Sequence, residues 1–199
     1  MIKTLTNPFR YVAGFRSLLI GLSLVVATSF IGHLSGTFFP DVISVKVGYT
    51  PTLLESLVNN LCNWFTISAI LYVAAITFSK SKVRLVDIFG TQALARAPYL
   101  IASCLGLSDA TDKFGKYILW ENLRMGSPVS ISNSEIALAI ALMVLTIMLT
   151  IWLIVLMYNA FKESSNIKGN RSILIYTVSL LIAVVLSILL SKGVNSLVL

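Results

Sequence analysis

The chain has 199 residues, of which 57% are hydrophobic and 12% are charged, and its formal net charge is +7. Soluble domains contain about 25% charged residues, so this composition excludes an ordinary soluble domain and favours a membrane protein. The basic residues are divided among short loops and form no run, which argues against a nucleic-acid partner and for the anionic headgroups of membrane lipids. Apolar stretches recur to the end without a linker, and we therefore expect a single transmembrane domain over residues 1–199.

Residues 17–39 form the first apolar run, which as a helix is long enough to cross the roughly 30 Å hydrocarbon core of a bilayer. The run is longer than the apolar region of a secretory signal peptide and no A-x-A site follows it, so we interpret it as a retained span. Gly32 and Gly36 have the spacing of a close-packing motif, which we assign to packing within the chain rather than to dimerisation. Ahead of the run, Asn7-Pro8 predicts the start of a short helix in the membrane interface.

Further apolar runs complete a predicted all-α bundle of five transmembrane helices with short interfacial helices. The expected spans are residues 17–39, 53–78, 84–107, 136–161 and 172–190. The second and fourth spans are preceded by capping-box patterns, Thr52-x-x-Glu55 and Ser132-x-x-Glu135. The long connection between the third and fourth spans mixes aromatic, apolar and charged residues, which predicts another interfacial helix.

The distribution of basic residues predicts the orientation of these spans. Because Lys and Arg are enriched in cytoplasmic loops, we place the more basic set of segments inside. With the N-terminus inside, the inside segments carry Lys3, Arg10, Arg16, Lys80, Lys82, Arg84, Lys162, Lys168 and Arg171. The outside segments carry the smaller set Lys46, Lys113, Lys116, Arg124 and Lys192. We therefore expect a multi-pass membrane protein with its N-terminus inside and its C-terminus outside.

The third expected span, residues 84–107, contains the most unusual chemistry of the chain. It carries Gln92 and Arg96 and is interrupted by Pro98. A cation near the middle of a membrane helix costs about 2.5–3.5 kcal/mol, and proline leaves a backbone carbonyl without its helical donor. Other helices must therefore surround this segment. An alternative geometry breaks the helix at Pro98, lays residues 83–97 along the inner surface and places Arg96 among the lipid headgroups.

Polar residues of the second and third spans form the candidate site. Its members are Asn59, Asn63, Gln92, Arg96, Pro98 and Tyr99. These side chains either line a hydrated cavity that binds an anionic group, or satisfy one another and the carbonyl freed by the proline. We favour the structural role. On that hypothesis, Arg96 is held by neutral acceptors on Asn59, Asn63 and Tyr99 and by backbone carbonyls.

The sequence contains no recognisable catalytic or metal-binding pattern. His33 is the only histidine, and we interpret it as a polar contact near the outer end of the first span. Cys62 and Cys104 lie in apolar stretches and match no metal-ligand spacing, so we expect free thiols. Neither a phosphate-binding loop nor a G-x-S-x-G nucleophile motif is present. We therefore expect a protein that is not an enzyme and has no metal site and no cofactor.

The third span reads D-I-F-G-T-Q-A-L-A-R-A-P-Y-L over residues 87–100, and a short basic loop precedes the last span. Together with the order of the apolar runs, this sequence resembles the Yip-domain family, whose eukaryotic members interact with Ypt/Rab GTPases. The resemblance covers residues 7–190 and is to the bacterial type, which implies a location in the bacterial cytoplasmic (inner) membrane. The D-L-Y-G-P segment of eukaryotic members is echoed only by Asp87–Gly90, so Rab binding is not implied. The family resemblance implies a five-span fold and no catalytic residue.

Two hypotheses for the function follow. The first is a non-enzymatic integral membrane protein that acts in membrane organisation or partner binding, its partners being membrane lipids and either other membrane proteins or a second copy of the chain. The alternative is a small transporter or channel that uses the polar stripe of the second and third spans.

Overall fold

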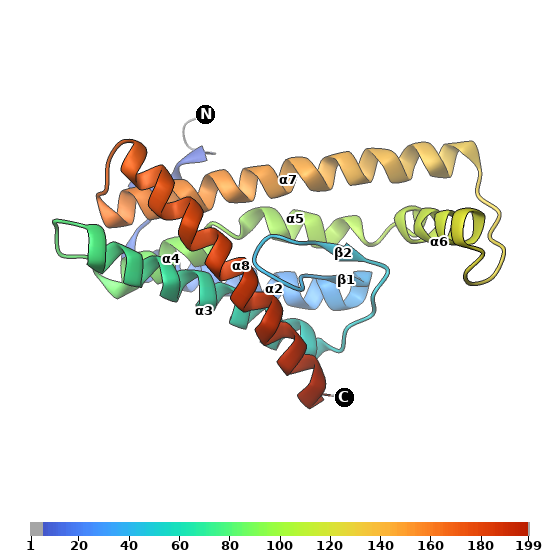
Figure 1. Cartoon of the computed structure of the whole chain (residues 1–199), viewed down its shortest axis with the longest axis horizontal. Coiled ribbons are helices and arrows are strands. Elements are labelled where there is room, and N and C mark those ends of the chain that lie inside the picture. The colour runs from blue at the N-terminus through green and yellow to red at the C-terminus, as the bar shows by residue number, and fades with distance from the viewer. Residues whose placement is uncertain (1–5, 199) are drawn as a thin grey trace.

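The computed structural model describes residues 6–198 of the chain and the side chains of residues 6–193; Lys3, which the charge count used, lies outside them (Figure 1). The described chain is mostly helical, which confirms the all-α class. Its elements are η1 (Pro8–Arg10), α2 (Gly14–Ser35), β1 (Thr37–Phe38), β2 (Lys46–Val47), α3 (Leu53–Phe78), α4 (Leu85–Leu94), α5 (Ala97–Leu105), α6 (Ala110–Leu123), α7 (Asn133–Ser165) and α8 (Asn170–Val198).

Four of these helices, α2, α3, α7 and α8, are long and apolar enough to cross a membrane. Many of their large apolar side chains are exposed, as expected for surfaces that contact lipid rather than water. The chain is therefore a multi-pass membrane protein. The predicted third span is not one continuous helix, because a turn at Ala95 and Arg96 divides it into α4 and α5.

The two short helices α4 and α5 follow one another along the bundle and both pack against α2 (Figure 1). In α4, the Thr91 hydroxyl lies 3.0 Å from the Ser164 hydroxyl near the end of α7. Near the end of α5, the carbonyl of Ser103 accepts a hydrogen bond of 3.4 Å from Thr37, which follows α2. The pair thus extends from one end of the bundle to the other.

The N-terminal part of the chain differs from the prediction at the end of the first span and in the segment ahead of it. Helix α2 ends at Ser35 because Gly36 adopts the left-handed conformation, with φ of 66°. The chain then enters the β1–β2 hairpin instead of continuing to residue 39. The predicted interfacial helix is only the turn η1, and Asn7 does not cap it; its amide donates instead to Glu163 at 2.8 Å.

Several local predictions are confirmed. Both capping boxes are formed, by Thr52 with Glu55 and by Ser132 with Glu135. The His33 ring makes the expected polar contact, with Nδ1 lying 2.8 Å from the carbonyl oxygen of Pro51. The thiols of Cys62 and Cys104 are unpaired, although Cys104 is exposed rather than buried in the bundle.

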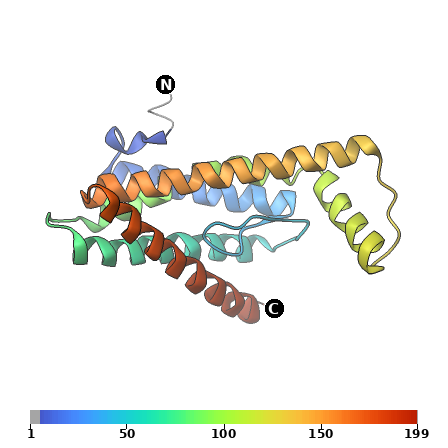
Figure 2. The same cartoon turned by 45° about the horizontal axis from the view of Figure 1, so that its top comes forward.

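Helix α6 and the first part of α7 form an arm that extends beyond the other helices (Figure 2). Ala110 is the only buried residue of α6, so little of this helix packs into the bundle. Lys113 of α6 forms a 3.0 Å ion pair with Glu135 in the first turn of α7. This ion pair links α6 to the start of α7.

We predict that acid loosens the contact between α6 and α7. The pKa of Glu135 is lowered to about 2 because its carboxylate accepts hydrogen bonds from the Ser132 backbone and hydroxyl and from Lys113. A lowered folded-state pKa means that this stabilisation is present above the unfolded value of 4.5 and is lost as the pH falls towards 2. Hydrogen exchange across residues 110–123 should accelerate over this range beyond its intrinsic pH dependence. In Glu135→Gln the exchange should already be fast at pH 6. If this variant shows the same dependence of exchange on pH as the unsubstituted protein, the effect of acid does not come from Glu135.

Candidate functional site at the centre of the bundle

All six predicted site residues are buried, in helices α3, α4 and α5 and in the turn between α4 and α5. Asn59 and Asn63 lie one turn apart on α3, Gln92 lies on α4, Arg96 lies in the turn, and Pro98 and Tyr99 lie in the first turn of α5. The structure does not bring them together as one cluster. Some of them bond to the hairpin loop, one bonds to helix α7, and Arg96 borders a small internal cavity.

The asparagines of α3 bind the hairpin loop between β1 and β2. The amide nitrogen of Asn63 donates to the carbonyl oxygens of Phe39 at 2.8 Å and Asp41 at 3.0 Å, and the amide of Asn59 also donates to Phe39. These carbonyls belong to backbone that lies inside the bundle and has left regular secondary structure. Buried carbonyls without donors are costly, so the two amides stabilise the inserted loop.

Tyr99 contacts the same loop from the opposite side. Its hydroxyl donates to the carbonyl of Val42 at 3.0 Å, and its ring stacks on Phe39 with the ring centroids 4.5 Å apart. Three of the six predicted residues therefore have the same structural role, because together they hold residues 39–42 between α3 and α5.

Gln92 has a separate partner. Its amide nitrogen donates to the carbonyl of Met157 in α7 at 3.0 Å, which joins α4 to that long helix. On the neighbouring face of α4, Trp64 of α3 donates to the carbonyl of Phe89 at 3.0 Å. The polar and aromatic side chains around α4 thus bind backbone carbonyls.

Pro98 is the second residue of α5, a position where the absent N–H costs nothing because no helical acceptor is available there. The helix is interrupted two to three residues earlier, at Ala95 and Arg96, and α5 restarts with the Tyr99 N–H donating to the Arg96 carbonyl at 2.9 Å. The structure thus contains the helix break of the alternative geometry. Arg96 is only 2% exposed, however, which disagrees with its placement among lipid headgroups.

Arg96 is the exception among these residues, because its side chain has no hydrogen-bond partner. The buried atoms Nε, Nη1 and Nη2 are all without an acceptor, and the closest ring is that of Tyr99, with its centroid 5.8 Å from the guanidinium carbon. The expected acceptors on Asn59, Asn63 and Tyr99 are not bonded to it. Arg96 borders a cavity that is too narrow for a water-sized sphere and is also lined by Val25, Thr28, Asn60 and Tyr99.

Two polar residues near this centre were not predicted from the sequence. Asp41 is 4% exposed, and its carboxylate accepts from the backbone of Ile43 and Ser44 at 2.8 and 2.9 Å. Thr28 presents a buried hydroxyl without a partner. The sequence does contain a signal that this connection is buried, because the apolar residues Phe39 and Val42 lie on either side of Asp41.

These contacts define a multi-pass helical membrane protein with an internal polar centre. Among the described residues, no group of three His, Cys, Asp or Glu side chains gathers as for a metal ion. No family model, curated protein or solved structure matches the chain. The likeness to the Yip-domain family thus rests on the third-span residues and on the layout of the apolar runs.

Proposed function

We propose that this protein is a non-enzymatic membrane protein of Yip-like type that acts in membrane organisation or partner binding through its outer surface. The proposal is supported by what the polar side chains of α3 and α5 bind. Asn59, Asn63 and Tyr99 bond to the chain's own loop, which occupies the place that a solute would need. The large surface that is left for contacts with lipids or partners is the exposed apolar side of the long helices.

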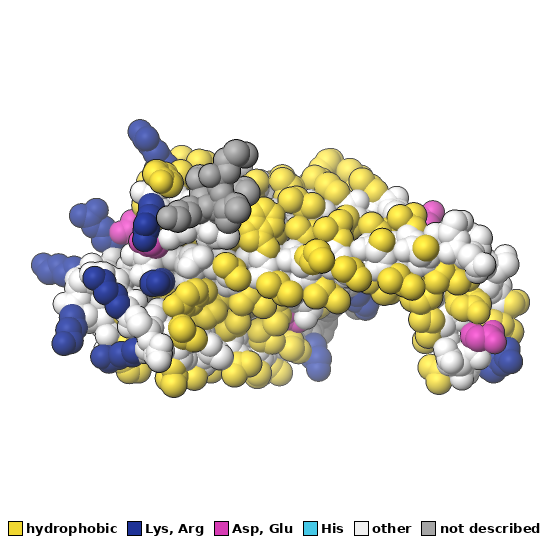
Figure 3. Space-filling view, turned by 90° about the horizontal axis from the view of Figure 1, so that it is seen from above, with side chains coloured by type: hydrophobic (Ala, Val, Ile, Leu, Met, Phe, Trp, Pro, Cys, Tyr) yellow, Lys and Arg dark blue, Asp and Glu magenta, His cyan; other side chains and the backbone are white. Residues whose placement is uncertain are grey.

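One end of the bundle is strongly basic, which supports an inner-membrane orientation with this end in the cytoplasm (Figure 3). The turns that follow α3 and α7 meet there, since Ser79 donates to the carbonyl of Ser165 at 2.8 Å. The N-terminal segment joins them through the 3.0 Å ion pair of Arg10 with Glu163. The basic residues of these three segments are Arg10, Arg16, Lys80, Lys82, Arg84, Lys162, Lys168 and Arg171.

We predict five membrane crossings, with α4 and α5 together making the third. A reporter inserted near Ser165 should then be on the cytoplasmic side, and one fused after Leu199 should be outside. The physical reason is that α7 ends at the basic end, whereas α8 leaves it obliquely and ends beside the start of α3 (Figure 1). Reporters on the same side of the membrane would exclude an odd number of crossings.

The proposed function is tested by affinity purification in mild detergent, followed by identification of bound proteins and lipids. We expect a defined membrane partner or a self-associated form to co-purify in a fixed ratio. A clean monomer that transports a solute in liposomes would contradict the proposal.

A specific observation supports the alternative of a small transporter or channel. The unpartnered donors of Arg96 and the unpartnered hydroxyl of Thr28 lie at the same small cavity, which has to widen before water or a solute can enter it. On this alternative, Thr28→Val should reduce solute flux without weakening the fold, because that hydroxyl makes no hydrogen bond. Thr77→Val, at an exposed hydroxyl near the basic end, is the control.

A further inference from the structure

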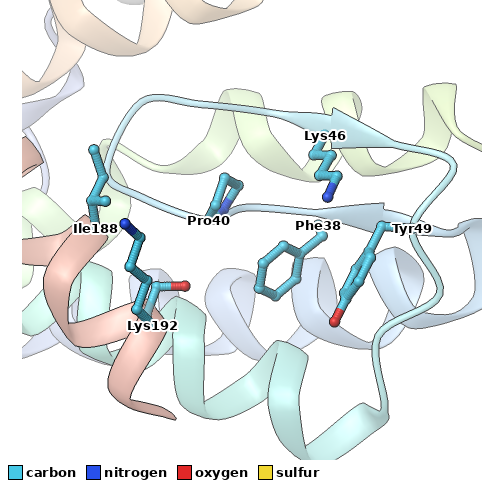
Figure 4. A pocket seen from close by; sticks show the side chains of 7 residues that line it. Phe38, Pro40, Lys46, Tyr49, Ile188 and Lys192 are labelled. Carbon is cyan, nitrogen blue, oxygen red and sulfur yellow. The ribbon is translucent and has the colours of Figure 1, made fainter. Parts of the chain in front are cut away.

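A second pocket lies at the other end of the bundle, between the hairpin and the last turns of α8. Its volume is about 200 Å³, and its walls include Phe38, Lys46, Tyr49, Ile188, Ser191 and Lys192. Figure 4 shows the Lys46 ammonium group directed towards Phe38 and the Lys192 ammonium group on the other side of the pocket, beside Ile188. One lysine comes from β2 and the other from α8, so the pocket exists only in the folded chain.

The two lysines make this pocket positively charged. None of the ion pairs among the described residues involves Lys46 or Lys192; the Lys46 ammonium lies 4.8 Å from the Tyr49 ring centroid. Glu55 is the acid beside Tyr49, but its oxygens accept from the Tyr49 hydroxyl at 2.8 Å and from the Thr52 backbone at 3.3 Å. Two positive charges at a shared concavity favour an anion.

The pocket opens onto an apolar stripe of α8. Leu181, Val185, Ile188 and Lys192 follow at i, i+4, i+7 and i+11, which places them on one helix face. Leu181 and Val185 are 63% and 58% exposed, so this face is free for lipid chains. The stripe leads from the pocket towards the middle of the bundle.

The pocket and the basic end lie at opposite ends of α8. Arg171 lies at the basic end, and Lys192 follows it by about 32 Å along the axis of α8, which crosses the other helices obliquely (Figure 1). A ligand with an anionic head at the pocket and an apolar chain along α8 fits both the charge and the stripe.

We infer that this pocket binds the phosphate group of an anionic phospholipid, with Lys46 and Lys192 on the phosphate and an acyl chain along Leu181, Val185 and Ile188. A zwitterionic headgroup fits less well because its cation meets two ammonium groups. Free phosphate lacks the apolar contacts of the stripe. The inference requires only a membrane location and does not depend on the partner-binding function proposed above.

The test uses the full-length protein in mild-detergent micelles with a photoactivatable phosphatidylglycerol. We expect adducts on α8 residues 181–192 and on the hairpin, with competition by unlabelled phosphatidylglycerol but not by phosphatidylcholine or inorganic phosphate. Each lysine near an anionic lipid contributes a similar amount to the binding free energy. The double variant Lys46→Gln/Lys192→Gln should therefore lower the apparent affinity for the lipid about tenfold or more. Lys80→Gln/Lys82→Gln removes the same charge at the basic end and should leave these adducts unchanged.

Three outcomes would overturn the inference. Adducts spread evenly along all exposed helices would indicate ordinary lipid contact, and an unchanged double variant would remove the lysines from the site. Equal competition by inorganic phosphate would assign the pocket to a free anion instead of a lipid. If the double variant fails to fold, the single variants Lys46→Gln and Lys192→Gln provide the same comparison, with an expected loss of about fivefold each.

Discussion

Gly21→Ala should destabilise the protein by about 2 kcal/mol, although alanine is the better helix former. Gly21 of α2 faces the backbone of α4 so closely that an added Cβ would lie 2.4 Å from the Leu94 nitrogen and 2.5 Å from the Ala93 carbonyl carbon. Backbone atoms cannot rotate away as a side chain can, so α2 and α4 must separate. This separation removes close packing along their whole contact, which outweighs the propensity gain of about 1 kcal/mol.

The measurement is the free energy of unfolding in mixed micelles, compared with the same substitution at Gly115. A Cβ at Gly115 in α6 meets nothing within 4 Å, so Gly115→Ala should be neutral or stabilising by up to about 1 kcal/mol. Gly90→Ala on the facing helix should behave like the Gly21 variant, since its Cβ would lie 2.8 Å from the Gly14 carbonyl oxygen. Equal effects at Gly21 and Gly115 would show that α2 and α4 are not in this close contact.

The sequence predicted the elements whose signals are local. Apolar runs longer than a bilayer thickness located α2, α3, α7 and α8, and the capping boxes at Thr52 and Ser132 marked two helix starts. It also singled out buried polar residues correctly as groups that other elements must surround. These inferences need only periodicity, length and the cost of burying polar groups in an apolar medium.

The remainder depended on contacts between distant segments. Gly36 fits a helix face as well as a left-handed helix end, and only the inserted hairpin decides between them. The same insertion buries Asp41 and provides carbonyls for Asn59 and Asn63, so the partners predicted for Arg96 are bonded elsewhere. The break at Ala95 and Arg96, in contrast, lies two to three residues before Pro98, where a proline is expected to interrupt a helix.

Arg96→Leu should be tolerated or should stabilise the fold, whereas Arg96→Glu should destabilise it strongly. Arginine stays charged when buried, and here its three nitrogen atoms have no acceptor. Leucine removes that uncompensated charge without breaking a hydrogen bond; replacing buried charges with apolar side chains is often neutral or stabilising by about 1–4 kcal/mol. A glutamate would place an unpaired carboxylate at the same buried position, and an unpaired buried charge costs about 3–5 kcal/mol.

Unfolding free energies of both variants in the same micelles test this difference, with Arg96→Gln as the neutral polar control. A leucine variant that loses more than about 3 kcal/mol would show that Arg96 is bound to a group that stabilises it. If the leucine variant folds but no longer binds the partner found by purification, the arginine serves function rather than stability.

The burial of position 96 is tested with Arg96→Cys in a Cys62→Ser/Cys104→Ser background. Because Arg96 is 2% exposed, the new thiol should react slowly with an impermeant reagent applied to the basic side, and rapid labelling would contradict its burial.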